Sequence, residues 1–191
     1  QVESFSWLCE EMLPKAIEIC VILDRDYRTE STVQDVLESF KQRGIFAHVW
    51  SRKELESYVL TPSVIARFSG ATVGDVEKWI DSITEGMADD VFSRLLDERI
   101  RAESSGTNHA VNVTSKFKKE FDKSWKDASF RRNVCPPKKI LSALNQTLQT
   151  AGVRTVSSAS LARAHRLADI GPEMTVLLRE IEAMISTSRS S

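Results

Sequence analysis

The chain has 191 residues, of which 41% are hydrophobic and 28% are charged, and its formal net charge is −1. These values predict one globular domain, or one with a smaller attached part, that buries a proper core. A net charge so near zero excludes attraction of nucleic acid by the overall field, so such a partner would need a local basic patch. No apolar run approaches the length of a membrane span, and we expect no membrane contact.

The start of the chain and its cysteines suggest a context. Cys9, Cys20 and Cys135 form an odd, scattered set without metal-ligand spacing, which predicts reduced thiols and a cytoplasmic protein. The sequence opens at Gln1 directly on a helix-like segment. We therefore expect it to be a piece of a longer protein.

The first elements in chain order predict a parallel crossover unit. A helix is expected at 4–14, and the apolar run ICVIL predicts a buried strand at about 17–23. The segment STVQDVLESFKQRG predicts a helix, and IFAHVW (45–50) predicts a second strand. A strand, a helix and a strand with short joints are typical of parallel pairing.

The remaining elements are predicted to be helical. Ser51 and Glu54 have the spacing of a capping box, and Thr61-Pro62 favours a new helical turn. Further helices are expected at 72–101 with a break at Gly86, and at 111–127, 137–150, 158–168 and 173–186, whereas 153–156 predicts a short strand or a link.

The fold class is therefore α/β: a parallel-sheet unit in residues 1–60, a mainly helical region in 61–186 and a polar tail in 187–191. Two parallel strands are too few to be stable alone. We expect further strands upstream of the chain, or a strand that the pattern does not reveal.

Two aspartates mark the candidate site. Asp24 and Asp26 follow the first strand directly, and residues two apart project to the same side while extended geometry lasts. The C-terminal ends of parallel strands are where ligands bind in open α/β sheets. Two adjacent carboxylates repel each other unless a cation intervenes, and magnesium prefers oxygen ligands. A turn after a strand also favours Asp, so turn chemistry is the alternative explanation.

The residues ILDRD at the strand end, followed by a helix, a strand and KELESYVL, resemble the second half of a TOPRIM domain. More narrowly, they are similar to the TOPRIM nuclease half of the OLD family and of related ATPase-linked nucleases. The resemblance covers residues 1–60 well and the helical region loosely. It implies a partial TOPRIM sheet, here followed by helices.

The resemblance implies particular ligands and catalytic groups. Asp24 and Asp26 match the Asp-x-Asp of the family, and the later acid corresponds to Glu56 as first choice and Glu54 as second. These four would hold Mg²⁺ or Mn²⁺. A family lysine corresponds to Lys138 or Lys139, although proline stands where the family has glycine.

The resemblance also implies what the chain lacks. The glutamate that follows the first TOPRIM strand has no counterpart here, and no glycine-rich phosphate loop of an ATPase occurs. The implied whole protein is a metal-dependent DNA endonuclease linked to an N-terminal ATPase domain, which would bind ATP. We expect it to form a homo-oligomer, to serve prokaryotic antiviral defence, and to be inactive as this fragment alone.

A basic stretch, KFKKEFDKSWKDASFRRNVCPPKK (116–139), is the second candidate feature. Phe117, Phe121 and Trp125 recur every four positions, which predicts a core stripe with the lysines facing outward. Such a face is usually only solvated, but beside a metal site it can contact phosphates. The resulting nucleic-acid-binding candidates are Lys116, Lys119, Lys123, Arg131, Arg132 and Lys139.

Two rival functions remain open. The chain can be a non-catalytic helical module for dimerisation or partner docking, with a degenerate TOPRIM unit attached. A HAD-like phosphotransferase also places Asp-x-Asp after a strand, but it requires Thr or Val where Arg28 stands. Convergence of Asp24, Asp26 and Glu56 in space would favour the nuclease over the docking module.

Overall fold

The computed structural model describes residues 19–103 and 107–188, so the helix predicted at 4–14 lies outside the described residues. The protein is a mixed α/β structure, 69% helical, with a small two-stranded parallel sheet. The α/β class predicted from the sequence is confirmed at this level.

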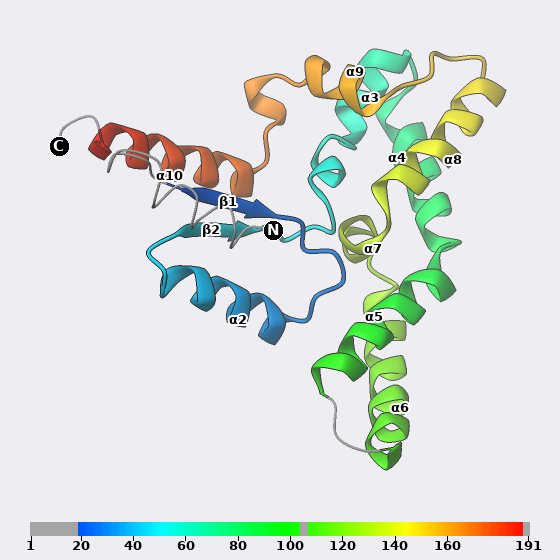
Figure 1. Cartoon of the computed structure of the whole chain (residues 1–191). Helices are drawn as coiled ribbons and strands as arrows, with labels where there is room; N and C mark the ends of the chain where they lie inside the picture. Colours follow the sequence, from blue (N-terminus) through cyan, green and yellow to red (C-terminus); the bar gives the residue numbers. More distant parts are fainter. Residues whose placement is uncertain (1–18, 104–106, 189–191) are drawn as a thin grey trace.

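The sheet has the predicted crossover arrangement. Strand β1 (Cys20–Leu23) is followed by helix α2 (Glu30–Lys41) and strand β2 (Phe46–Val49). The strands pair in parallel, from Cys20 opposite Phe46 to Leu23 opposite Val49. Helix α2 lies on one side of the sheet and helix α10 (Pro172–Ser188) on the other (Figure 1). Both strands therefore end at the same edge, which faces the helical region.

The helical region begins with a 3₁₀ turn and continues through short helices. Their bounds are η1 Leu55–Tyr58, α3 Pro62–Ser69, α4 Val73–Glu85, α5 Ala88–Ala102, α6 Thr107–Ser124, α7 Ala128–Val134, α8 Pro137–Thr150, α9 Ser158–Ala164 and η2 Leu167–Asp169. The break predicted at Gly86 is confirmed, and residues 153–156 form a link. Helix α7 was not predicted.

The hydrophobic core lies among the helices that follow the sheet. Ile65 of α3, Ile80 of α4, Leu144 and Leu148 of α8 and Leu161 of α9 are all fully buried. Each of these helices turns one apolar side toward the others, as the helical spacing of their apolar residues requires. Tyr27, from the loop after β1, packs against the same cluster. That contact joins the sheet unit to the helical region.

Helices α5 and α6 form an antiparallel pair that extends away from the rest of the chain (Figure 1). The aromatic stripe predicted for α6 is confirmed as packing: Phe117 stacks on Phe92 at 5.6 Å between ring centroids, and Phe121 stacks on Trp125 at 4.9 Å. Phe121 is only 4% exposed. The lysines between the aromatic positions consequently face outward.

Candidate functional site

The loops after the two strands are tied together by the predicted aspartates. Strand β1 ends at Leu23, and Asp24 Oδ1 accepts a hydrogen bond from the Leu55 backbone N–H at 3.0 Å. The Asp26 N–H donates to the Lys53 carbonyl at 2.8 Å. Asp26 has φ +51°, a left-handed conformation that Asp tolerates better than most residues. Because the extended geometry has ended, the two carboxylates make different contacts.

The two candidate glutamates face the same lysine. Glu54 Oε2 lies 3.8 Å and Glu56 Oε1 lies 3.4 Å from Lys138 Nζ, which comes from the start of α8. The charges of Glu56, Glu54 and Asp24, with the Glu56 hydrogen bond as the largest cause, raise the pKa of Lys138 above its ordinary value. Two of the four predicted acids therefore lie near one ammonium group, and a third, Asp24, accepts the backbone N–H of Leu55 between them.

The capping box predicted for Ser51 and Glu54 is wrong. No helix starts at Ser51, and Glu54 is extended with φ −142° at the start of η1. The Ser51 hydroxyl instead donates to Glu173. Glu54 is thus released from a capping role and turns its carboxylate toward Lys53 and Lys138.

The structure distinguishes between the two candidate lysines, Lys138 and Lys139. Lys139 Nζ lies 2.8 Å from Asp90 Oδ2 on α5. Adjacent residues of a helix point in directions about 100° apart, so they cannot both face one site. Of these two candidates, Lys138 is the one that stands beside the acids.

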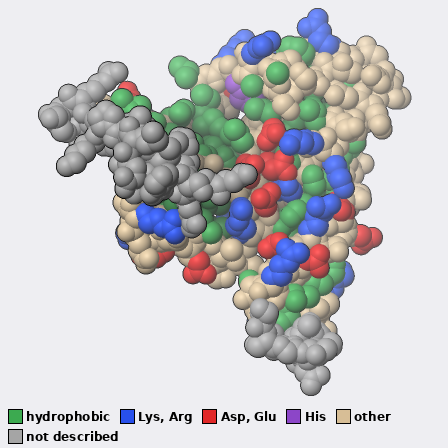
Figure 2. Space-filling view, in the orientation of Figure 1, with side chains coloured by type: hydrophobic (Ala, Val, Ile, Leu, Met, Phe, Trp, Pro, Cys, Tyr) green, Lys and Arg blue, Asp and Glu red, His purple; other side chains and the backbone are tan. Residues whose placement is uncertain are grey.

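A buried lysine that sequence reasoning missed completes the group. Lys53 is 7% exposed, and its Nζ contacts Glu54, lies 3.8 Å from Asp26 Oδ1 and stands 5.0 Å from the Tyr27 ring centroid. A buried ammonium is stable only when it is paired. We call Asp24, Asp26, Glu54, Glu56, Lys53 and Lys138 the acidic site. Acidic and basic side chains gather at the centre of the face shown in Figure 2.

The donor set of the acidic site fits a hard cation in its chemistry. Within 19–103 and 107–188, no group of three His, Cys, Asp or Glu side chains is placed to hold a metal ion. The carboxylates instead pair with Lys53 and Lys138. Magnesium is commonly held by one or two carboxylates and completes its shell with water. Glu56, 3.4 Å from Lys138 Nζ, and Asp24, which accepts the neighbouring Leu55 N–H, are the carboxylates that would form such a pair.

A carboxylate from α10 holds the segment that carries the glutamates. Glu173 Oε1 accepts the Ser51 backbone N–H at 2.8 Å and lies 3.1 Å from His48 Nε2, and Glu173 Oε2 accepts the hydroxyls of Ser51 and Tyr58. Burial alone would raise the pKa of Glu173, but the hydrogen bonds from Ser51 and Tyr58 and the nearby His48 hold it below its ordinary value. Ionised Glu173 therefore fixes the start of the loop from Ser51 to Tyr58.

We expect the Glu173→Gln variant to unfold at lower temperature than the wild type at pH 7, by an amount that shrinks on acidification. A carboxyl whose pKa is depressed by folding contributes stability above its unfolded pKa, and this contribution is lost as pH falls through the folded value. The difference should therefore decline below about pH 4. Thermal unfolding followed by circular dichroism at pH 7, 5 and 3.5 measures it. Glu182→Gln, at an exposed position of α10, is the control, and an equal effect of both changes at pH 7 would contradict the role of Glu173.

The structure places the residues of the predicted basic surface in different environments. Lys116, Lys119 and Lys123 are exposed on α6. Arg132 forms an ion pair with Asp81 at 2.7 Å. Arg131 is only 8% exposed, and its guanidinium donates to the Trp125 carbonyl at 2.8 Å and to Thr84 Oγ1 at 3.4 Å. That position does not suit phosphate contact, so Arg131 is better explained as a structural residue.

Comparison with known proteins identifies no relative: no family model, no curated protein and no solved structure matches this chain. None of the helices in the described residues is long and apolar enough to cross a membrane. The interpretation of the acidic site therefore rests on the chemistry of its side chains.

Proposed function

We propose that this chain is the nuclease half of a metal-dependent, ATPase-linked DNA endonuclease of the OLD type, with a partial TOPRIM unit in residues 1–60. The observation that carries the proposal is the meeting of Glu54 and Glu56 with Lys138 beside Asp24, which accepts the N–H of Leu55 between the two glutamates, after two parallel strands. These residues come from three separate parts of the sequence. Antiviral defence, the ATPase partner and oligomer formation extend the proposal through the TOPRIM resemblance.

In this proposal each side chain has a separate task. Asp24 and Glu56 would hold Mg²⁺ or Mn²⁺, with Glu54 and Asp26 as further carboxylates at the same edge. A bound ion of this kind supplies a Lewis acid for the attacking water and for the leaving oxygen. Lys138 is 74% exposed and can place its charge against the phosphate as negative charge develops there. Glu54 keeps Lys138 oriented, and Lys53 neutralises Glu54 and Asp26 from the buried side.

Cleavage of supercoiled plasmid DNA by the natural full-length protein tests the proposal. We expect cleavage with Mg²⁺ or Mn²⁺, none after EDTA treatment, and a loss of about 10- to 100-fold in rate for Glu56→Gln, which keeps the shape of the side chain but removes its charge. Glu38→Gln, an exposed glutamate of α2, is the matched control. Metal-independent cleavage, or equal cleavage rates for the Glu56→Gln and Glu38→Gln variants, would contradict the proposal.

A second candidate function is supported by apolar side chains exposed on α10, where Leu178 and Ile185, seven residues apart, share one side of the helix. Val176, Leu178 and Ile185 are each more than half exposed on this helix. Exposed apolar side chains on one helix favour docking of a partner or of a second copy of the chain. Docking needs none of the acids, so it would survive the loss of Glu56.

A further inference from the structure

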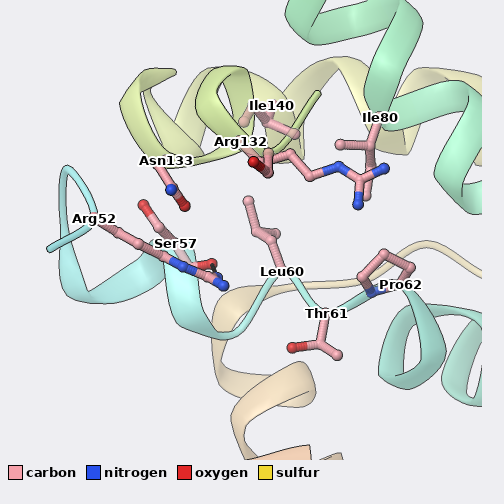
Figure 3. A pocket seen from close by; sticks show the side chains of 10 residues that line it. Arg52, Ser57, Leu60, Thr61, Pro62, Ile80, Arg132, Asn133 and Ile140 are labelled. Atoms are coloured by element: carbon pink, nitrogen blue, oxygen red, sulfur yellow. Dashed lines mark hydrogen bonds between the residues drawn. The ribbon is translucent and has the colours of Figure 1, made fainter. Parts of the chain in front are cut away.

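A pocket separate from the acids opens between the segment that contains η1 and the helices α4, α7 and α8. Its volume is about 200 Å³. Arg52, Ser57 and Asn133 line one part of it, and Arg132 reaches in beside Ile80, with Leu60 between the two arginines (Figure 3). The pocket thus combines two cations with apolar walls, and residues far apart in the sequence build it.

The two arginines keep N–H groups for a ligand. Arg52 Nη1 donates to the Ser57 carbonyl at 2.9 Å, and its guanidinium stands 4.7 Å from the Tyr58 ring centroid. Within the part of the chain that the structure describes, no carboxylate pairs with Arg52. Arg132 uses Nε and Nη2 for Asp81, at 3.2 and 2.7 Å. A guanidinium carries five N–H donors, so each arginine retains some of them.

Ser57 provides an independent sign of a ligand. Its side chain is 4% exposed, it lines the pocket, and its Oγ is buried without a hydrogen-bond partner. A buried hydroxyl without a partner destabilises a fold, and native structures seldom keep one. Its Oγ has almost no accessible surface in this conformation, so it would donate to a ligand oxygen in the pocket after rotation about χ1.

The chemistry of the lining selects a phosphate group. Guanidinium groups bind phosphate and carboxylate by paired N–H donors. Arg52 and Ser57 line one side of Leu60 and Arg132 the other, and a tetrahedral anion with several oxygens can accept donors from more directions than a planar carboxylate with two. The remaining space is bounded by Leu60, Ile80 and Ile140. We propose that this pocket binds a phosphate group that carries a small, partly apolar body of about the size of a sugar.

Two sources share this chemistry: a free phosphate ester and a nucleotide unit of a DNA strand. Ser57 follows Glu56 directly in the sequence, so the pocket borders the segment that carries the glutamates of the acidic site. The binding itself requires no metal and no cleavage, and the pocket can therefore be tested apart from the proposed nuclease activity.

Isothermal titration calorimetry of the full chain in EDTA tests the pocket with thymidine 5′-monophosphate, thymidine and an eight-residue thymidylate strand. We expect the monophosphate to bind at least tenfold more tightly than thymidine. Arg52→Gln should weaken binding about tenfold and Ser57→Ala about threefold, with Arg163→Gln, an exposed arginine of α9, unchanged. Ser57→Ala removes only an unsatisfied hydroxyl, so it keeps the fold intact.

The ratio of the two phosphate ligands identifies the source. Tighter binding of the strand than of the monophosphate, lost in the same variants, assigns the pocket to DNA, and the reverse order assigns it to a free ester. Failure of both to bind, binding of thymidine as tight as that of its monophosphate, or an equal loss in Arg163→Gln would overturn the proposal. Unfolding temperatures of all variants, measured by circular dichroism, show that each remains folded.

Discussion

Replacing Asp24 and Asp26 together by alanine is expected to abolish metal-dependent plasmid cleavage by the natural full-length protein, with a rate loss of about 10³-fold or more. Both residues follow the C-terminal end of β1. The charge of Asp24 is among the causes that raise the pKa of Lys138. Without these carboxylates no ion would be held beside the phosphate. Quantifying nicked and linear plasmid over time, with Mg²⁺ and with Mn²⁺, measures the loss.

The control for this variant is the double change Asp35→Ala and Asp97→Ala. Both of those aspartates are exposed on helices, and their removal changes the net charge equally. The site variant also loses the hydrogen bond from the Leu55 N–H, at a cost of about 1 kcal/mol, so unfolding must be measured beside cleavage. Retained cleavage in a folded Asp24 and Asp26 variant would favour the turn-chemistry explanation of these residues and the docking function.

The Leu144→Ala variant is expected to lose about 2–5 kcal/mol in free energy of unfolding. Leu144 is 0% exposed in the middle of α8, and the alanine would leave a cavity that the surrounding helices cannot fill by small shifts. Urea unfolding followed by tryptophan fluorescence and circular dichroism measures the change. Helix α8 also presents Lys138, so the same variant is expected to weaken the acidic site at elevated temperature.

Leu167→Ala is the control for this core prediction, because Leu167 is 89% exposed in η2. Exposed substitutions of this kind alter the free energy of unfolding by no more than about 0.5 kcal/mol. Similar losses in the two variants would mean that α8 does not form the centre of the core.

Local patterns predicted most of the elements, because apolar spacing and punctuation by glycine and proline act within a few residues. Pro62, Gly86 and Pro172 begin or end helices where the sequence indicated. Helix α7 was missed because its seven residues are too few for a periodic pattern. The inward orientation of Arg131 was missed with it, since that orientation depends on acceptors from Trp125 and Thr84.

The site was predictable in the part that sheet geometry determines. The rule that ligands meet the ends of parallel strands places Asp24 near the residues after β2, and the structure brings Glu54 and Glu56 there. Lys53 was not predictable, because one lysine beside a glutamate has no pattern that distinguishes a buried ammonium from an exposed one. Glu173 lies 122 residues from Ser51 along the chain, and no local signal reports such a contact.

The acidic site draws its carboxylates from the loops after β1 and β2 and its exposed ammonium from α8. A recombination event that joined residues before 60 to the helices of an unrelated gene would therefore carry over the acids and leave Lys138 behind. Transfer of the helical region alone would carry Lys138 and leave the acids behind. The acidic site is therefore retained only when the segment before residue 60 and the helical region are inherited together.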